Sequence, residues 1–411
     1  MVTGTRRDQP GGLLGGLRVL DLTRFVAGSQ ATMLLAAMGA DVVKVEVPPG
    51  DPYRWQGTGF INGPGNGESV LFMALNSGKR SVAVDFRKPA GREVMERLLA
   101  TSDMLVENSR PGSLARHGLD WESVHERFPA LIYGSISGYG DVGPEAAKGG
   151  FDLILQAESG VMSVTGTPGS GPVKVGAPVL DVGAGLSCAL GMLGACIERQ
   201  RTGVGRLVSS SLLEFALASL GTLAADVLVS GAVPGLLGTH SPMFAPYGGF
   251  RTADGWMVLA GAGSEERWLR ACYVLGLSDL AADERFADNA SRVAHRDELT
   301  VEIEAVLTTR PAAHWLARFE AVGVPAAQVQ DLSQVLHRPQ VGALGAVQEL
   351  GHATAGAYRV ISPPLRVDKA ALGYPSPAPA LGADTRAVLT AAGLAPGEID
   401  RLVDAGIAVT A

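Results

Sequence analysis

Leu17-Arg-Val-Leu-Asp-Leu22 and Asp41-Val-Val-Lys-Val-Glu-Val47 are two apolar-rich runs of strand length near the start of the chain. Between them, Gln30–Met38 has the residue spacing of a helix and is followed by Gly39, a residue type that commonly ends helices. The order strand, helix, strand is typical of a crossover that joins two parallel strands. We therefore expect a βαβ unit here, at the beginning of a parallel sheet.

The alternation of strands and helices continues to about residue 137. Repeated alternation of this kind predicts an α/β fold with a doubly wound, Rossmann-like sheet. Ligands of such sheets bind beyond the carboxyl ends of the strands, so the loops after the strands are candidates for a binding site. The expected strands are Ser81–Phe86, Met104–Glu107 and Leu131–Ser137, the expected helices are Pro89–Ala100 and one or two within Leu114–Phe128, and the candidate loops follow Leu22, Val47, Glu107 and Ser137.

The second half of the chain has a different pattern of residues. Three helical stretches rich in small residues come first: Phe151–Val164, Asp181–Arg201 and Ser209–Val229. A hairpin with its turn at Ala253-Asp-Gly255 follows, then mostly helical sequence in which Trp268 and Trp315 are expected core residues. After residue 340, two strand-like pieces, a proline-rich crossing and helices from 384 onward predict a return to the first domain. The expected layout is a flexible N-terminus at 1–16, a large Rossmann-like domain at 17–230, a linker at 231–244, a smaller α+β domain at 245–335, and a linker with return to the large domain at 336–411.

Composition excludes several classes of protein. The chain has 411 residues, 46% of them hydrophobic and 18% charged, which is typical of a folded soluble protein. A net charge of −7 gives no basis for a nucleic-acid or anionic-membrane partner. The apolar stretches 182–197 and 211–238 are expected to be buried helices, and Met1–Gly16 has no apolar core of a secretory signal. The three cysteines are expected to be reduced, as in a cytoplasmic protein, and the seven histidines have no metal-ligand spacing, so we expect no metal.

Asp181 is the first candidate for a chemical role. It follows an apolar run and begins a helix-like pattern, which places its carboxylate at or beside a helix N-terminus, where the helix dipole favours negative charge. Gly183 and Gly185 are expected to keep the nearby surface open to a large ligand. A plain N-cap aspartate is the alternative interpretation.

Basic side chains at the strand ends are the second candidate. Lys79 and Arg80 precede a strand, Arg110 follows one, and Arg116-His117 lies a few residues further on. Forked guanidinium donors and a lysine point charge are the groups that bind phosphate. Each of these residues taken alone is equally consistent with a solvated turn.

A set of short motifs in fixed order resembles the class III coenzyme A transferases, the family that includes formyl-CoA, carnitine and dicarboxylate CoA transferases and the related α-methylacyl-CoA racemases. The resemblance extends from about Gly16 to the C-terminus. Each motif is weak alone, but the set is specific. The motifs are Gly16-Leu-Arg-Val-Leu-Asp-Leu, Gly39-Ala-Asp-Val-Val-Lys-Val-Glu46, Lys79-Arg-Ser, Glu107-Asn-Ser-Arg-Pro-Gly112, Gly138-Tyr-Gly140, Gly150-Phe-Asp152, Asp181 and Leu381-Gly-Ala-Asp-Thr385.

The resemblance implies a large Rossmann-like domain built from both chain ends, a small domain, and two subunits interlocked as a homodimer. It also implies that Asp181 is a nucleophile that forms an aspartyl–acyl anhydride and then an aspartyl-CoA thioester. Glycine-rich runs at Tyr247–Gly249 and Gly261–Gly263 are candidates for the oxyanion donors. The residues expected to contact coenzyme A are Phe25, Val26, Ala27, Lys79, Asn108, Arg110, Arg116, His117 and Tyr139.

Departures from the family pattern narrow the activity. Some members carry Lys where Ser137 stands and Arg where Val47 stands, and Val26 replaces a polar residue of the formyl-CoA enzyme, which argues against formyl or oxalate substrates. Phe151 stands where the racemases carry a catalytic histidine, and phenylalanine cannot transfer a proton. We therefore favour CoA transfer, with a 2-methylacyl-CoA racemase as the alternative and a non-catalytic acyl-CoA binding protein as a third reading.

The stretch Gly150–Gly166 is similar to the branch that uses succinyl- and glutaryl-CoA. A small dicarboxylate is therefore the expected substrate, as succinyl-CoA or another dicarboxylyl-CoA. Arg24 and His240 are the candidates to pair with its distal carboxylate, although either one is equally consistent with an exposed loop residue.

Overall fold

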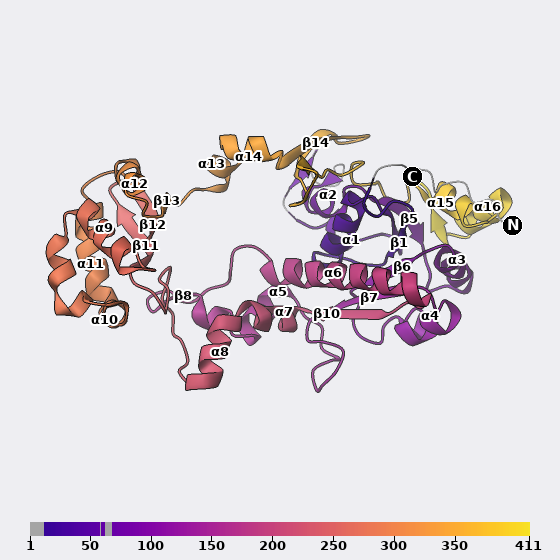
Figure 1. Ribbon diagram of the computed structural model, residues 1–411. Helices are drawn as coiled ribbons and strands as arrows, with labels where there is room; N and C mark the ends of the chain where they lie inside the picture. Colours follow the sequence, from indigo (N-terminus) through magenta and orange to yellow (C-terminus); the bar gives the residue numbers. More distant parts are fainter. Residues whose placement is uncertain (1–11, 58, 62–67) are drawn as a thin grey trace. The chain divides into compact units, whose positions relative to one another are not determined.

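The computed structural model describes residues 12–57, 59–61 and 68–411, which divide into two units (Figure 1). The first unit contains the chain up to Ser159 together with 175–221 and 339–411, and the second contains 160–174 and 222–338. The second unit thus includes the expected small domain at 245–335 together with 160–174, 222–244 and 336–338. The Gly238 N–H donates to the Gly166 carbonyl and joins the first two of these added stretches. The domain layout given above stays a prediction.

A seven-stranded sheet forms the centre of the first unit. Its strands lie in the order β10-β7-β6-β1-β2-β5-β18, and all pairs are parallel except the antiparallel edge pair of β18 with β5. Without β18, this is the Rossmann order, in which the strand sequence reverses between β1 and β6. The expected α/β fold with a mostly parallel sheet is confirmed. The strands are β1 (Arg18–Asp21), β2 (Asp41–Glu46), β5 (Arg80–Val84), β6 (Met104–Glu107), β7 (Ile132–Ser137), β10 (Leu207–Ser211) and β18 (Ala408–Val409).

Helices cover both faces of this sheet. A buried cluster joins one face to α3 (Pro89–Ala100), α4 (Trp121–Arg127), α15 (Thr385–Ala391) and α16 (Pro396–Asp404). On the other face, α1 (Ala27–Ala37) runs beside α6 (Val179–Thr202), as Figure 1 shows. Among the described residues α6 is long and apolar enough to cross a membrane, yet it packs against α1, β7 and β10 as a core helix of this unit.

Residues near the C-terminus complete the sheet. The Thr385 hydroxyl donates to the Val409 carbonyl at 2.7 Å and accepts from the Ala83 N–H at 3.2 Å. The Ser81 N–H donates to the carboxylate of Asp384 at 3.0 Å. These bonds join β5 to a segment about 300 residues later in the chain. The first unit is therefore built from an early and a late part of the sequence.

The second unit has its own sheet and core. Strands β11 (Tyr247–Thr252), β12 (Gly255–Ala260) and β13 (Ala326–Gln328) are antiparallel, and the expected hairpin turns at Asp254. Trp268 and Trp315 are buried in its core, as expected. Its main helices are α9 (Glu265–Leu275), α10 (Asn289–Ala294), α11 (Arg296–Leu307) and α12 (Ala312–Ala321).

The shorter elements complete the description. The helices are α2 (Val70–Asn76), α5 (Asp152–Glu158), α7 (Leu212–Ser219), α8 (Gly221–Ser230), α13 (Leu332–Leu336) and α14 (Pro339–Leu344). The 3-10 helices are η1 (Pro52–Arg54), η2 (Ala115–His117), η3 (Met162–Val164), η4 (Ser278–Ala282) and η5 (Glu284–Phe286). The two-stranded pairs are β3 (Phe60–Ile61) with β4 (Glu68–Ser69), β8 (Gly166–Thr167) with β9 (Gly171–Pro172), β14 (Val347–His352) with β15 (Gly356–Ile361), and β16 (Arg366–Val367) with β17 (Ala370–Ala371).

Two expectations about local structure need correction. The stretch Ser209–Val229 is not one helix: it begins inside strand β10 and continues as α7 and α8, because Ser211 ends the strand and caps α7 by accepting the Glu214 N–H. Of the N-terminal segment expected to be flexible, residues 1–11 lie outside the described residues. Residues 12–16 form a turn in which the Leu14 N–H donates to the Met38 carbonyl, which ties this part to α1.

Candidate active site around Asp181

Asp181 lies in the first turn of α6, as expected, but it is not the N-cap. The N-cap is Pro178, which supplies no side-chain hydrogen bond. Asp152, the first residue of α5, caps α6 instead: its Oδ2 accepts the N–H groups of Leu180 at 2.8 Å and Asp181 at 3.2 Å. The interpretation of Asp181 as a plain capping residue is therefore wrong, and its carboxyl group is left for another role.

A second residue of α5 holds Asp152 in place. The side-chain amide of Gln156 donates to Asp152 Oδ1, and its oxygen accepts the Val175 N–H at 2.8 Å. Gln156 is fully buried. The N-termini of α5 and α6 are thus joined by one carboxylate whose own position is fixed.

The surroundings of Asp181 favour its neutral form. Burial, with a further contribution from the negative charge of Asp152, raises the pKa of the Asp181 carboxyl from its ordinary value of 3.8 to about 7. Perturbed carboxyl groups of this kind are concentrated at catalytic sites. The side chain is only partly buried, so a substrate can still reach it.

Gly183 and Gly185 do not keep a surface open, contrary to expectation. A Cβ on Gly183 would lie 1.9 Å from the ring of Phe215, and one on Gly185 would lie 2.3 Å from the Ala27 carbonyl oxygen. Both glycines are buried and permit close packing. Gly185 in particular allows the start of α1 to lie directly against α6, one turn after Asp181.

The loop that precedes α1 is consequently brought to the site. It follows β1 at the point where the strand order reverses, the usual ligand position in such sheets. Phe25 has φ of +61°, a left-handed conformation rare for a residue with a side chain. Asn108, which follows β6, holds the loop: its side chain accepts the Arg24 N–H at 2.9 Å and donates to the Arg24 carbonyl at 2.7 Å. Val26 and Ala27 then begin α1 with no side-chain cap.

Three aromatic rings meet beside this loop. The ring of Phe25 lies edge-on to Tyr53 at a centroid distance of 5.4 Å and to Phe151 at 6.1 Å. Tyr53 was not among the sequence candidates, although it lies in the candidate loop after Val47. The sequence feature that could have indicated its position is the Asp51-Pro-Tyr53 run, in which Asp51 caps a short helix by accepting the Tyr53 N–H.

Lys79 has a structural position that does not favour the expected phosphate contact. Its ammonium group is fully buried and bonds to Asp21 at 2.8 Å, Asn76 at 2.9 Å and the Ser29 carbonyl at 3.1 Å. A lysine has three donors, and all are used inside the protein. Burial would raise the pKa of Asp21, but the charges of Lys79 and Lys44 outweigh burial and lower it to about 2.

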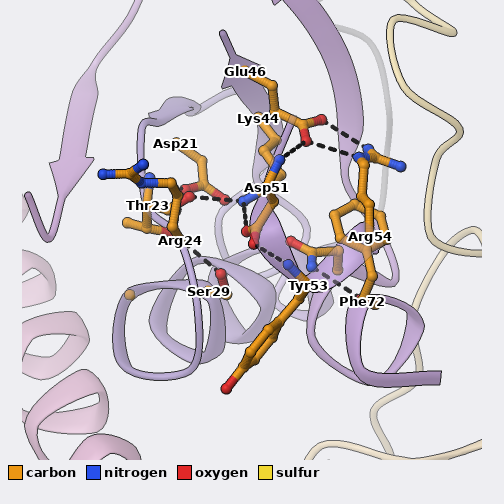
Figure 2. Close-up of polar contacts among 12 residues, drawn as sticks. Asp21, Thr23, Arg24, Ser29, Lys44, Glu46, Asp51, Tyr53, Arg54 and Phe72 are labelled. Atoms are coloured by element: carbon orange, nitrogen blue, oxygen red, sulfur yellow. Dashed lines mark hydrogen bonds and ion pairs between the residues drawn. The ribbon is translucent and has the colours of Figure 1, made fainter. Parts of the chain in front are cut away.

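This ion pair belongs to a balanced buried cluster at the ends of β1 and β2 (Figure 2). Lys44 lies 3.0 Å from Asp51 and donates to the Thr23 carbonyl at 2.8 Å. Arg54 forms a two-bond fork with Glu46 at 2.8 and 2.7 Å. Three cations and three carboxylates compensate one another, and together they fix the two loops that present Phe25 and Tyr53.

The remaining expected coenzyme A residues lie elsewhere in the first unit. Arg116 is exposed in η2, and Arg110 is exposed after β6. His117 packs edge-on to Phe86, and burial together with nearby arginines lowers its pKa. Tyr139 donates to Glu158 at 2.7 Å. Whether Arg110, Arg116, His117 and Tyr139 bind the nucleotide stays a prediction.

The glycine-rich candidates for oxyanion donors, and His240, belong to the second unit. The Gly249 N–H is already donated to the Thr239 hydroxyl at 2.8 Å, so it is not free to hold an oxyanion. Gly248 packs against His240: a Cβ there would lie 2.3 Å from the ring nitrogen. Tyr247, Gly248, His240, Gly261–Gly263 and Arg24 stay predictions for substrate contacts.

Comparisons with known proteins agree on one family. The family model described as CoA-transferase family III matches residues 14–385. Succinyl-CoA:glutarate CoA-transferase of Mus musculus is 37% identical over 92% of this chain and 85% of its own length. Succinate–glutarate CoA-transferase of Agrobacterium fabrum is 36% identical over 92% of this chain and 94% of its own length.

A solved structure gives the same result. The crystal structure of a CAIB/BAIF family protein from Brucella suis superimposes with a TM-score of 0.81, at 35% identity over 92% of this chain and 98% of that chain. The racemase alternative receives no support from these comparisons.

Proposed function

Because this chain belongs to CoA-transferase family III and is an enzyme of that class, we propose a covalent mechanism for it. In this proposal it exchanges coenzyme A between carboxylic acids through intermediates bound to Asp181. The observation that carries the proposal is the Asp181 carboxyl at the start of α6, whose pKa is raised to about 7 by burial and Asp152. A carboxylate that is more basic than usual and partly removed from water is a better nucleophile.

The exchange consists of four acyl transfers. A carboxylate oxygen of Asp181 attacks the thioester carbonyl of the donor acyl-CoA. The carbon–sulfur bond breaks, CoA thiolate is released, and an aspartyl–acyl anhydride is formed. The thiolate attacks the aspartyl carbonyl carbon and releases the donor acid, which gives an aspartyl-CoA thioester. The acceptor acid attacks that thioester to form a second anhydride, and the thiolate then takes the acceptor acyl group and restores the Asp181 carboxylate. No proton and no electron is consumed in the cycle.

Small dicarboxylates are the proposed substrates, with succinyl-CoA or another dicarboxylyl-CoA as the donor. Two relatives have succinyl or succinate and glutarate in their names. The stretch Gly150–Gly166, which contains Phe151 and Asp152, contributes directly to the surroundings of Asp181. The substrate class therefore has support from the part of the sequence that builds the site.

We also propose the interlocked homodimer and a cytoplasmic location. Large apolar side chains are exposed along α6, among them Leu190 (71%) and Ile197 (63%). Exposed large apolar side chains on one helix are typical of a protein–protein interface. Light scattering behind a sizing column tests the dimer. Cys188, Cys196 and Cys272 are buried free thiols, which is consistent with a reducing compartment.

Trapping with hydroxylamine tests the mechanism. The enzyme is incubated with succinyl-CoA, quenched with hydroxylamine and digested, and mass spectrometry is used to locate the hydroxamate. We expect it on Asp181, and we expect Asp181→Ala to exchange no CoA among succinate, glutarate and related acids. An exchange rate that survives in Asp181→Ala contradicts the covalent mechanism.

A solvent-isotope experiment tests the alternative. Deuterium incorporation at the α-carbon of a 2-methylacyl-CoA in heavy water reports proton exchange. We expect none above the rate of the Asp181→Ala control. Phe151 has no proton to exchange, and its ring is in contact with Phe25.

A further inference from the structure

Tyr53 is held in place by the buried ions behind it. Asp51 Oδ1 accepts its N–H at 3.0 Å, and Asp51 is itself paired with Lys44 at 3.0 Å. Figure 2 shows the ring of Tyr53 extending away from this cluster, so that the hydroxyl is its most distant atom. The base of the side chain is therefore fixed, and the hydroxyl is presented outward from the end of β2.

A series of contacts connects the ring of Tyr53 to the surroundings of Asp181. Phe25 packs between Tyr53 and Phe151, and Phe151 directly precedes Asp152, whose carboxylate binds the Asp181 N–H. Burial, then the negative charges of Asp181 and Asp51, raise the pKa of the Tyr53 hydroxyl. The hydroxyl thus keeps its proton at neutral pH and is close enough to Asp181 for that charge to act on it.

The hydroxyl has no hydrogen-bond partner among the residues that the structure describes, although the side chain is partly buried. Because it is not fully buried, an acceptor from outside the chain can reach it. Burial and the carboxylate of Asp152 are the main influences on the charge of Asp181, and both make binding of an incoming anion unfavourable. A neutral donor at this position would offset that effect.

We propose that Tyr53 is a further catalytic residue: its hydroxyl donates a hydrogen bond to an oxygen of the carboxyl group that is exchanged at Asp181. This inference rests on the proposed function. The bond strengthens as negative charge grows on that oxygen in the tetrahedral states on either side of the anhydride, so it lowers the barrier more than it tightens binding of the acid.

Tyr53→Phe removes the hydroxyl and retains the ring contact with Phe25. Tyr374→Phe is the matched control, since it removes a buried tyrosine hydroxyl from the core cluster against which Tyr53 packs. For exchange from succinyl-CoA to glutarate we expect kcat of Tyr53→Phe to fall about 10- to 100-fold, with KM for glutarate within a factor of about two. The melting temperature and the Kd for CoA should match those of the wild type, because no internal bond of the described chain is lost.

A wild-type kcat in Tyr53→Phe overturns the inference, whether or not KM rises, because a raised KM alone would place the hydroxyl at the distal carboxylate. An equal fall in Tyr374→Phe also overturns it, since the loss would then be a general effect of deleting a hydroxyl. A wild-type enzyme that exchanges no CoA with any acid contradicts the proposed function itself, and that result is distinct from a change seen only in the variant.

Discussion

The raised pKa of Asp181 predicts that this side chain destabilises the fold at neutral and alkaline pH. Its pKa is 3.8 in the unfolded chain and about 7 in the folded protein. Below pH 3.8 both states are protonated and folding carries no penalty. As pH rises to 7, the unfolded state loses its proton while the folded state keeps it, so stability falls, and above pH 7 the loss is complete.

The magnitude follows from the same two values. A shift of about three units corresponds to about 4 kcal/mol at 1.36 kcal/mol per unit. Because the side chain is only partly buried, solvent screening reduces this, and we expect about half. Asp181→Asn, which removes the charge and nearly preserves the shape, should therefore be more stable than the wild type by about 1 kcal/mol at pH 5 and about 2 kcal/mol at pH 8.

Urea unfolding at pH 5, 6.5 and 8 measures this difference. Asp226→Asn is the control, because Asp226 is exposed on α8 and its replacement should change stability equally at all three pH values. A constant difference between Asp181→Asn and the wild type from pH 5 to pH 8 would refute the reasoning, because it would mean that folding does not change the pKa of this group.

Three further predictions follow from the packing and charges of the first unit. Asp152→Asn removes the charge that helps raise the pKa of Asp181, so the acid limb of the pH–rate profile should move to lower pH; an unmoved limb would exclude this coupling. Gly185→Ala should lower the free energy of unfolding by about 2 kcal/mol, because the added Cβ would lie 2.3 Å from the α1 backbone. Gly194→Ala, in open space on the same helix, should raise it by about 0.5–1 kcal/mol. Chemical denaturation measures both, and equal effects would contradict the packing argument. Lys79→Ala leaves a buried aspartate unpaired and should cost about 3–5 kcal/mol in thermal unfolding; weaker CoA binding with unchanged stability would instead support a phosphate contact.

The sequence was sufficient to predict those parts of the fold that depend on local residue patterns. Apolar runs of strand length separated by helical segments predicted the parallel sheet, and the spacing after Asp181 placed it at a helix start. Strand β10 was missed because Leu207-Val-Ser-Ser-Ser211 has only two apolar residues. It is an edge strand with partly exposed side chains, so little hydrophobic pattern is required of it.

Long-range pairing could not be predicted. Lys79 has the sequence context of a loop cation, and only its pairing with Asp21, 58 residues earlier, shows that it is buried. Gly185 similarly gains its role from α1, which a single sequence does not place beside it. Tyr53 was missed because a tyrosine in a loop carries no motif, and its contact with Phe25 depends on the folding of two separate loops.

The late position of β18 has a consequence for biosynthesis. Because Ala408 and Val409 pair with β5, that strand has an unpaired edge for as long as the ribosome is still producing the preceding 300 residues. An uncovered strand edge is a template for association with other chains. Nascent or prematurely terminated chains of this protein should accordingly depend on chaperones, and deletion of the last few residues should direct the product to inclusion bodies even though every residue around Asp181 is retained.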